Sequence, residues 1–325
     1  MKKLSPLLKK LVAILNDGEF HSGNDLGETL KVSRAAIWKN IKQLIDYGLA
    51  IESLHGKGYR LAEALIILDE DRLKKALNPG ICSRLEVFAT MPSTQDYIKQ
   101  NLKDPVGNRL CLAEQQTMGR GRLGRSWFSD FGRNICLTYL WQTEKDLSQL
   151  GGLSLVVGLS LVEAIKASGI DIPLKVKWPN DIICHDKKMA GILIELTTEA
   201  YSNSQVMIGI GLNVNAVDTE DKSITQAWTS LRKETHKALD RNEIVLKLMP
   251  ILYNFLNQFE QQGLESFMPL WQHYDYLQGK TISLITGNTE LNGKVLGING
   301  QGLLSLQLPD GKQKSFASGE ASIKK

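Results

Sequence analysis

Residues 119–125 read Gly119-Arg120-Gly121-Arg122-Leu123-Gly124-Arg125, three glycines and three arginines in seven positions of a 325-residue chain. Glycine lets the backbone turn sharply and come close to a ligand. Arginine offers a planar, permanently charged fork that matches carboxylates and phosphates. Strand-like apolar stretches lie before and after it, at residues 110–113 and 134–141, and a disordered Arg-Gly tail would not lie between two strands. The pattern therefore favours an ordered loop that wraps a multiply anionic small molecule over a merely solvated basic loop.

The composition is typical of a folded, water-soluble protein, with 42% hydrophobic and 23% charged residues. The length suggests two or three domains. No run of about 18 apolar residues occurs, so we expect no transmembrane helix and no membrane partner. Lys9 and Lys10 interrupt the first apolar stretch, which does not suit a signal peptide. We therefore expect a cytoplasmic protein.

The cysteines and histidines show no metal-binding or redox spacing. The cysteines are far apart and the five histidines form no HExxH pattern. We therefore expect reduced, mostly buried thiols and no zinc ion held by the protein. The four cysteines are Cys82, Cys111, Cys136 and Cys184.

Residues 1–64 have the pattern of a winged helix-turn-helix domain. Ser5-Pro6, Ser22 and Ser33 can each begin a helix: the first has apolar residues at helical spacing over 7–15, the second runs from Ser22 through Leu26 to Leu30, and the third covers 34–47. Two short strands, 50–53 and 59–61, follow around the turn Gly56-Lys57-Gly58. Residues 1–63 hold ten Lys and Arg against seven Asp and Glu, which is +3 of the net charge of +4. This excess indicates a module that faces nucleic acid.

In such a module the third helix enters the major groove by its N-terminal end, and the hairpin reaches a phosphate. The spacing in that helix places Ile37, Ile41, Leu44 and Ile45 inward. Trp38 is either a core residue or a groove contact, and a module used only for protein interaction is the alternative. The residues expected to face DNA are Ser33, Arg34, Ala35, Trp38, Lys39 and Lys57.

From about residue 83 the pattern changes to strand-like runs mixed with longer helices. This indicates an α+β domain with a large sheet over residues 83–276, joined to the first module by a linker, 65–82, with a short helix from Asp69 through Leu77. Residues 277–325 read as short strands separated by turns. Central strands are predicted at 85–89, 110–114, 134–141, 176–178, 191–196 and 206–213, and helices at 95–102, 150–168 and 242–261.

Four polar or glycine-rich motifs lie at or near predicted strand ends. Hydroxyls at a helix start can be simple N-caps, and glycine within a strand often marks a bulge or the close approach of a ligand. Each motif alone is therefore weak evidence for a ligand-binding site. They are Pro92-Ser93-Thr94-Gln95, Lys177-Trp178-Pro179-Asn180-Asp181, Asp186-Lys187-Lys188-Met189-Ala190-Gly191 and Gly209-Ile210-Gly211-Leu212-Asn213-Val214-Asn215.

Taken in order with the Arg-Gly loop, these motifs resemble those of the biotin–protein ligases. With the winged helix in front, the chain is similar to the bacterial bifunctional biotin–protein ligases and biotin operon repressors. In the N-terminal module the resemblance rests on Phe20-His21-Ser22-Gly23, Ser33-Arg34-Ala35-Ala36-Ile37 and Gly56-Lys57-Gly58-Tyr59. It implies a winged helix, a mixed-sheet ligase domain of the class II synthetase type, and a C-terminal SH3-like β-barrel closed by residues 319–323.

The resemblance implies an enzyme that makes biotinyl-5′-AMP from biotin, ATP and Mg²⁺. The enzyme then transfers biotin to a lysine of the biotin carboxyl carrier protein of acetyl-CoA carboxylase. It also implies repression of the biotin operon, with the adenylate as corepressor favouring a homodimer that binds operator DNA. A ligase without regulation, and a ligand-sensing repressor without catalysis, are the alternatives. Ligation of lipoate is disfavoured because that related fold lacks this loop.

The resemblance also implies roles for individual residues. Lys188, Arg120 and Arg122 would be catalytic, and Asp181 would orient Mg²⁺. Gln95 stands where the family usually has asparagine and Leu123 where relatives often carry another arginine, which affects one polar contact to biotin and the loop's charge. Biotin would contact Ser93, Thr94, Gln116, Gly119, Arg120, Lys188, Gly191, Leu193, Gly209 and Gly211. ATP or the adenylate would contact Arg122, Arg125, Trp127, Asn180, Asn213 and Trp228.

Overall fold

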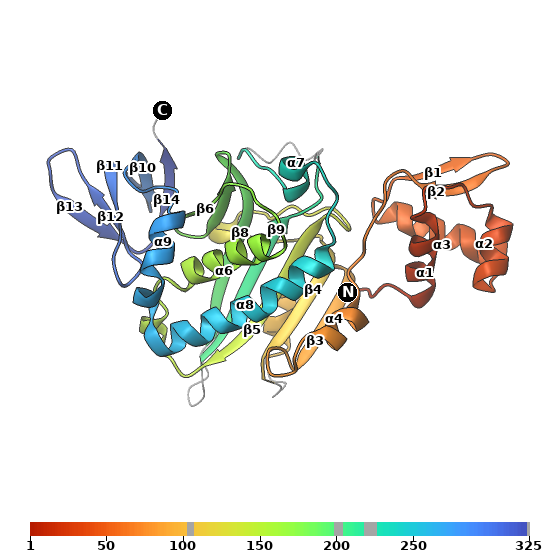
Figure 1. The fold of residues 1–325 in the computed structure, drawn as a ribbon, viewed down its shortest axis with the longest axis horizontal. Helices are drawn as coiled ribbons and strands as arrows, with labels where there is room; N and C mark the ends of the chain where they lie inside the picture. The colour runs from red at the N-terminus through yellow and green to blue at the C-terminus, as the bar shows by residue number, and fades with distance from the viewer. Residues whose placement is uncertain (103–106, 198–203, 218–225, 324–325) are drawn as a thin grey trace.

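A computed structural model describes residues 1–102, 107–197, 204–217 and 226–323. Figure 1 shows three parts in a row: a helical module at the N-terminal end, a central sheet covered by helices, and a small β domain at the C-terminal end. The predicted order of fold types along the chain is confirmed. Within the described residues, no helix is both long and apolar enough to cross a membrane.

The N-terminal module is a winged helix-turn-helix made of α1 (Pro6–Leu15), α2 (Gly23–Leu30), α3 (Arg34–Asp46) and the hairpin β1 (Ile51–Leu54) and β2 (Gly58–Leu61). The hydroxyls of Ser5, Ser22 and Ser33 each accept a backbone N–H three residues on, which caps the three helices as predicted.

One inward residue was predicted wrongly. Ile37, Ile41 and Leu44 are buried, but Ile45 is 48% exposed. At roughly 100° per residue, Ile45 lies about 80° around the helix from Ile37, at the margin of the apolar face.

The winged helix packs directly against the central domain. The rings of Tyr47 and Phe131 stack at 5.0 Å between centroids with an interplanar angle of 3°. Glu63, just after the wing, pairs with Arg133 at 3.0 Å and Arg232 at 2.9 Å. The winged helix is therefore in contact with the central domain through both apolar and charged groups.

The N-terminal residues return to the same domain. Lys2 forms an isolated antiparallel bridge with Thr90 at the edge of the central sheet, and Lys3 Nζ lies 3.0 Å from Glu70. Burial by itself raises the pKa of Glu70, but hydrogen bonds from Lys74, the Val87 N–H and Lys3 outweigh it and lower that pKa to about 2. The ionised Glu70 carboxylate therefore holds the N-terminal residues against the central domain through Lys3.

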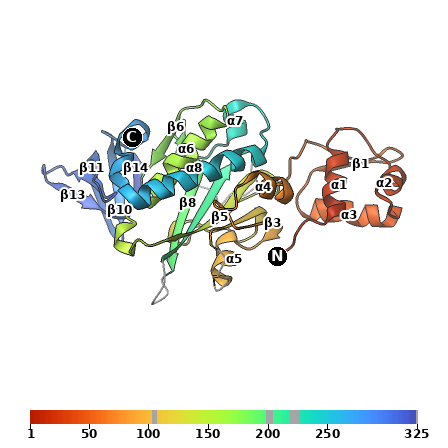
Figure 2. The ribbon, with the colours of Figure 1, turned by 60° about the horizontal axis from the view of Figure 1, so that its bottom comes forward.

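The central domain is a seven-stranded mixed sheet in the order β3-β4-β5-β9-β8-β7-β6, in which only β3 and β4 pair in parallel. Helices α6 and α8 cover one face and α5 packs on the other (Figure 2). The strands are β3 (Arg84–Met91), β4 (Arg109–Gln116), β5 (Asn134–Thr143), β6 (Leu174–Lys177), β7 (Asp181–Cys184), β8 (Lys187–Thr197) and β9 (Ser204–Asn213). The helices are α4 (Glu70–Ala76), α5 (Thr94–Gln100), α6 (Leu153–Ala167), α7 (Leu231–Thr235), α8 (Arg241–Gln262) and α9 (Met268–Tyr274).

The sequence patterns missed β7, α7 and α9, which are all short. Residues 177–181 were singled out as dense in polar groups just after a strand, yet Asp181 begins β7, which pairs with both β6 and β8. The apolar run of β7 is short and lies between two polar motifs, so its pairing with the neighbouring strands decides it.

The predicted linker is held to the central domain by a buried ion pair. Glu114 and Arg241 are both 0% exposed, and Arg241 Nη2 donates to Glu114 Oε2 at 2.5 Å. The second oxygen of Glu114 accepts the Leu68 N–H at 2.5 Å, and Arg241 also donates to the Ile66 carbonyl at 2.8 Å. Residues 66–68 are thereby fixed on the start of α8 and on β4.

The C-terminal domain is a five-stranded antiparallel sheet in the order β13-β12-β11-β10-β14, the SH3-like unit that was predicted. Its closing strand pairs back with the first one. The indole N–H of Trp178 donates to the Gly302 carbonyl at 3.1 Å and ties this unit to the central domain. The strands are β10 (Thr281–Thr286), β11 (Thr289–Ile298), β12 (Leu304–Gln307), β13 (Gln313–Phe316) and β14 (Glu320–Ile323).

Candidate active site and nucleic-acid interface

The four motifs and the Arg-Gly loop meet around one cavity of about 660 Å³. The start of α5, the loop after β4, the β6–β7 turn, the start of β8 and the glycines of β9 form its walls, and β14 contributes from the C-terminal domain. Residues as far apart in sequence as Ser93 and Ser322 thus share one site. Predicted residues among its lining are Ser93, Thr94, Gln116, Arg120, Arg122, Arg125, Trp127, Asn180, Asp181, Lys188, Gly191, Leu193, Gly209 and Gly211.

At one end of the cavity the hydroxyls belong to a buried polar network. The Thr94 N–H and its Oγ1 donate to Gln116 Oε1 at 2.8 and 3.0 Å, and Thr94 Oγ1 lies 2.8 Å from Thr138 Oγ1. Ser93 caps α5 by accepting the Asp96 N–H at 3.3 Å. These groups can orient a planar ligand with donors and acceptors, such as a cyclic urea. Thr138 was not predicted, although a threonine inside an apolar strand was a signal for it.

Gln95, which departs from the family pattern, lies over the floor of this end. Its Nε2 donates to the Leu193 carbonyl at 3.4 Å. A Cβ at position 209 would overlap Gln95 Oε1. Gly209 therefore leaves room for a buried amide side chain that faces the cavity, and glycine is required there for that close approach.

The Arg-Gly loop is an ordered turn. The Gly121 N–H donates to the Arg125 carbonyl at 2.6 Å, and the Trp127 N–H donates to the Gly119 carbonyl at 2.8 Å. Leu123 has a φ of 56° and is 76% exposed. A non-glycine residue in the left-handed region is uncommon, so this tip carries backbone strain with no packing of the Leu123 side chain to offset it.

Acidic groups neutralise two of the loop arginines. Arg120 pairs with Asp96 and lies 3.5 Å from Glu195, and Arg125 pairs with Glu320 of β14. Both arginines are therefore held in place by carboxylates that an anionic ligand can replace.

Arg122 differs from its two neighbours. Its Nη1 donates to Asn180 Oδ1 at 3.4 Å, and burial lowers the pKa of its guanidinium. Among the residues that the structure describes, Arg122 forms no ion pair with a carboxylate, and such a partly desolvated cation gains most from an incoming phosphate.

Lys188 is fixed at the start of β8 between the two halves of the site. Its backbone N–H donates to the Ala227 carbonyl and its carbonyl accepts the Thr229 N–H, both at 2.9 Å. Its Nζ lies 2.7 Å from Asp181 Oδ1. Lys177 lines the same wall, and burial lowers the pKa of its ammonium group. Lys177 was not named as a site residue, although its motif was singled out.

Trp127 separates the main cavity from a smaller one of about 110 Å³. A Cβ at Gly211 would overlap the Trp127 ring, so that glycine makes room for the indole. In the smaller cavity Asn134 Nδ2 donates to Asn213 Oδ1 at 2.8 Å, and Trp228 forms an apolar wall. An aromatic wall beside amide groups suits a purine base. Gly119 lines neither cavity, but a Cβ there would overlap the Trp127 carbonyl.

The residues predicted to face DNA are all exposed. Ser33, Arg34, Ala35, Trp38 and Lys39 are exposed at and near the N-terminal end of α3, and Lys57 is exposed at the tip of the wing. Trp38 is 57% exposed with Lys42 Nζ 5.5 Å from its ring centroid, so it does not belong to the core.

The chain thus combines a winged helix, a mixed-sheet domain with an arginine loop, and a small C-terminal β domain. Three family profiles match: the biotin/lipoate A/B protein ligase family at residues 87–215, an HTH domain at 7–60, and the biotin protein ligase C-terminal domain at 278–324.

The bifunctional ligase/repressor BirA of Salmonella typhimurium is 40% identical over 314 residues, which covers 97% of this chain and 96% of that protein. That of Escherichia coli is 39% identical over 315 residues, with the same coverage. A biotin protein ligase from Aquifex aeolicus in complex with biotin and ATP superposes with a TM-score of 0.65 at 30% identity, covering 74% of this chain and 98% of that one. The chain belongs to the biotin protein ligase family.

Proposed function

We propose that this protein is a biotin–[acetyl-CoA-carboxylase] ligase that also represses transcription of the biotin operon. It forms biotinyl-5′-AMP from biotin and ATP and passes biotin to a lysine of the biotin carboxyl carrier protein. One observation carries the proposal: Arg120, Arg122 and Lys188 meet the Thr94–Gln116 network around one cavity.

The cavity supplies what the first half-reaction needs. An oxygen of the biotin carboxylate attacks the α-phosphorus, and the bond from that phosphorus to pyrophosphate breaks. Two anions must approach, so cations have to offset their repulsion. Arg120 and Arg122 would straddle the carboxylate and the α-phosphate, while Ser93, Thr94 and Gln116 orient the ureido ring.

Lys188 would serve both half-reactions. Turned from Asp181 toward the ligand, its ammonium group would bond the carboxylate and then the acyl-phosphate oxygen, which disperses the charge left on AMP. In the second half-reaction the carrier lysine, as the free amine, attacks the acyl carbon, the bond to AMP breaks, and the amine loses its proton to water.

The nucleotide would occupy the smaller cavity and the rim beside it. Trp228 and Trp127 would pack on the adenine, and Asn180 and Asn213 would contact the nucleotide, with Arg125 near the phosphates. Mg²⁺ fits the one-carboxylate site at Asp181, since this ion keeps most of its ligands as water and phosphate oxygens. When bound, it would offset part of the triphosphate charge. Lys188 would then leave Asp181 for the substrate.

The repressor function rests on the exposed end of α3 and on the contacts between the two domains. We propose that the adenylate favours a homodimer whose two winged helices bind a two-half-site operator, as dimeric helix-turn-helix proteins do. We keep the domain boundaries at 1–64, 65–82, 83–276 and 277–325, and place the protein in the cytoplasm, where ATP and operator DNA are both present.

The first test is biotin-dependent exchange between ATP and pyrophosphate. Lys188→Ala and Arg122→Ala should each slow exchange roughly 10²–10³-fold, the usual cost of losing one group that stabilises developing charge. Lys187→Ala is the matched control, because Lys187 precedes Lys188 and is exposed. No exchange by the folded wild type would refute the enzyme and favour a ligand-sensing repressor. Operator binding that does not respond to biotin and ATP would instead favour a ligase without regulation.

A further inference from the structure

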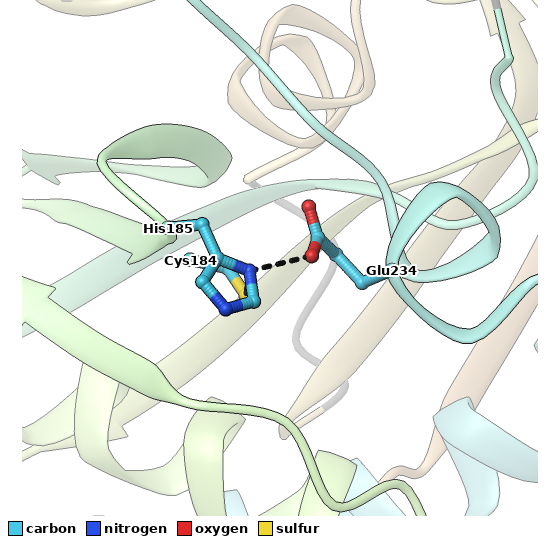
Figure 3. Close-up of side chains that lie close together, drawn as sticks. All are labelled: Cys184, His185 and Glu234. Carbon is cyan, nitrogen blue, oxygen red and sulfur yellow. Dashed lines mark hydrogen bonds and ion pairs between the residues drawn. The ribbon is translucent and has the colours of Figure 1, made fainter.

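Three metal-ligating side chains converge outside the substrate cavity. The donor atoms of Cys184, His185 and Glu234 all lie within 4.8 Å of one another. His185 Nδ1 is 2.7 Å from Glu234 Oε2 and 3.5 Å from Cys184 Sγ. Figure 3 shows the Glu234 carboxylate directed at this ring nitrogen, with the Cys184 sulfur behind the imidazole ring. The spacing of the cysteines and histidines predicts no zinc site, because Glu234 is supplied from 49 residues further along the chain.

Two separate segments hold these groups in place. Cys184 ends β7, and His185 and Asp186 form the turn into β8 with φ angles of 46° and 61°. Glu234 lies on α7, where Thr229 Oγ1 donates to its other oxygen at 2.5 Å. Positive φ at both residues is the conformation of a two-residue type I′ hairpin turn, so the β7–β8 hairpin itself sets the position of His185 opposite Glu234.

The donor set has the composition of a zinc-type site. Zinc takes cysteine sulfur, histidine nitrogen and carboxylate oxygen, commonly three protein ligands with water in a fourth position. Cys184 is buried, whereas the His185 side chain is 60% exposed, so an ion could enter from solvent and keep a water ligand on that side. A thiolate and an imidazole favour zinc over Mg²⁺. If His185 and Glu234 formed only an ion pair, no thiol would be needed beside the same imidazole nitrogen; a metal site would use all three groups.

We propose that Cys184, His185 and Glu234 bind a zinc-class divalent cation, with the thiol proton released to solvent. The ion would join the β7–β8 turn, which leads into Lys188, to α7, which follows Trp228. Binding of the ion is independent of the proposed function; only its effect on the ligase site rests on that function. The expected consequence is a slower opening of the segment that connects the catalytic lysine to the nucleotide cavity.

The test is titration of the metal-free, full-length protein with Co²⁺, followed by competition with Zn²⁺. One equivalent of Co²⁺ should give a thiolate-to-cobalt charge-transfer band that Zn²⁺ removes. Cys184→Ser should abolish the band, and His185→Ala and Glu234→Gln should weaken binding by at least roughly tenfold, since even groups outside the ligand shell change metal affinity 10–100-fold. Cys82→Ser and His273→Ala are the matched controls and should leave the titration unchanged.

Hydrogen exchange gives a second readout that needs no activity. Zinc should slow exchange of amides in residues 231–235 in the wild type and leave them unchanged in Glu234→Gln. The proposal is overturned if the wild type binds no Co²⁺ at one equivalent, or if the band survives in Cys184→Ser. If Cys184→Ser does not fold, the His185 and Glu234 variants decide, because those side chains lie nearer the surface. Pyrophosphate exchange by zinc-free protein, with Mg²⁺ and ATP supplied, reports on the ligase separately, so the two failures can be told apart.

Discussion

Replacing Glu114 with alanine should destabilise the protein by at least about 3 kcal/mol. Arg241 would remain fully buried without its carboxylate, and breaking one partner of a buried pair costs about 3–5 kcal/mol. The Leu68 N–H, which donates to Glu114 at 2.5 Å, would lose its acceptor as well, at about 1–3 kcal/mol. The two costs share one site and need not add fully.

Glu114→Gln spares only the smaller contribution. If the amide oxygen accepts the Leu68 N–H, the amide NH2 group faces the Arg241 guanidinium, donor against donor. The cost of the broken buried pair therefore remains, about 3–5 kcal/mol. The double variant Glu114→Leu with Arg241→Met should lose less than the sum of its two single variants, because no charge is then left buried alone.

Urea unfolding, followed by tryptophan fluorescence and by far-ultraviolet circular dichroism, measures these differences. The chain has several domains, so only a transition that both signals share is converted into a free energy. The reasoning is refuted if Glu114→Ala unfolds within about 1 kcal/mol of the wild type, a change typical of surface positions rather than of a broken buried pair. Additive single variants would show that the two side chains do not interact.

Three further predictions concern the loop, Glu70 and the residues predicted to face DNA. Asp96→Asn removes the closer of the two carboxylates beside Arg120 and should tighten biotin binding in calorimetric titration by up to about fivefold, the worth of an exposed ion pair. Unchanged affinity would mean that the ion pair of Arg120 with Asp96 persists when biotin binds. The folded-state pKa of Glu70 is about 2, below its ordinary 4.5, so its contribution to stability is complete above pH 4.5 and is lost as the pH falls toward 2. The difference in unfolding free energy between wild type and Glu70→Gln should shrink over that window, and a constant difference would contradict the assignment. Lys57→Ala should lower the slope of the logarithm of the DNA-binding constant against log salt by about 1 for any DNA sequence, whereas Trp38→Ala should reduce the preference for the operator. The reverse pattern would mean that Trp38 contacts the phosphate backbone and Lys57 contributes to sequence recognition.

Most elements of the fold could be predicted because their signals are local. A serine cap followed by apolar residues at helical spacing gave α1 to α3 within a residue or two, and strands of eight or more residues carried enough apolar positions to be recognised. The predictions for Ile45 and for β7 failed for the same reason. At the margin of a helix face, or in a short apolar run between two polar motifs, only the neighbouring element decides what is buried.

The sequence by itself determined which chemical groups this protein carries and where its loops, caps and close approaches must lie. The glycines at positions 209 and 211 and the arginines of the loop are of this kind, since glycine and arginine have properties that no context removes. Only the tertiary structure decided what each group faces. The pairing of Arg120 with Asp96 and of Arg125 with Glu320, and the meeting of Cys184 with Glu234, join segments far apart in the chain. The physical reason is that helix and strand periodicity act over a few residues, whereas the partner of a charge or a thiol is set by how the sheet brings distant strands together.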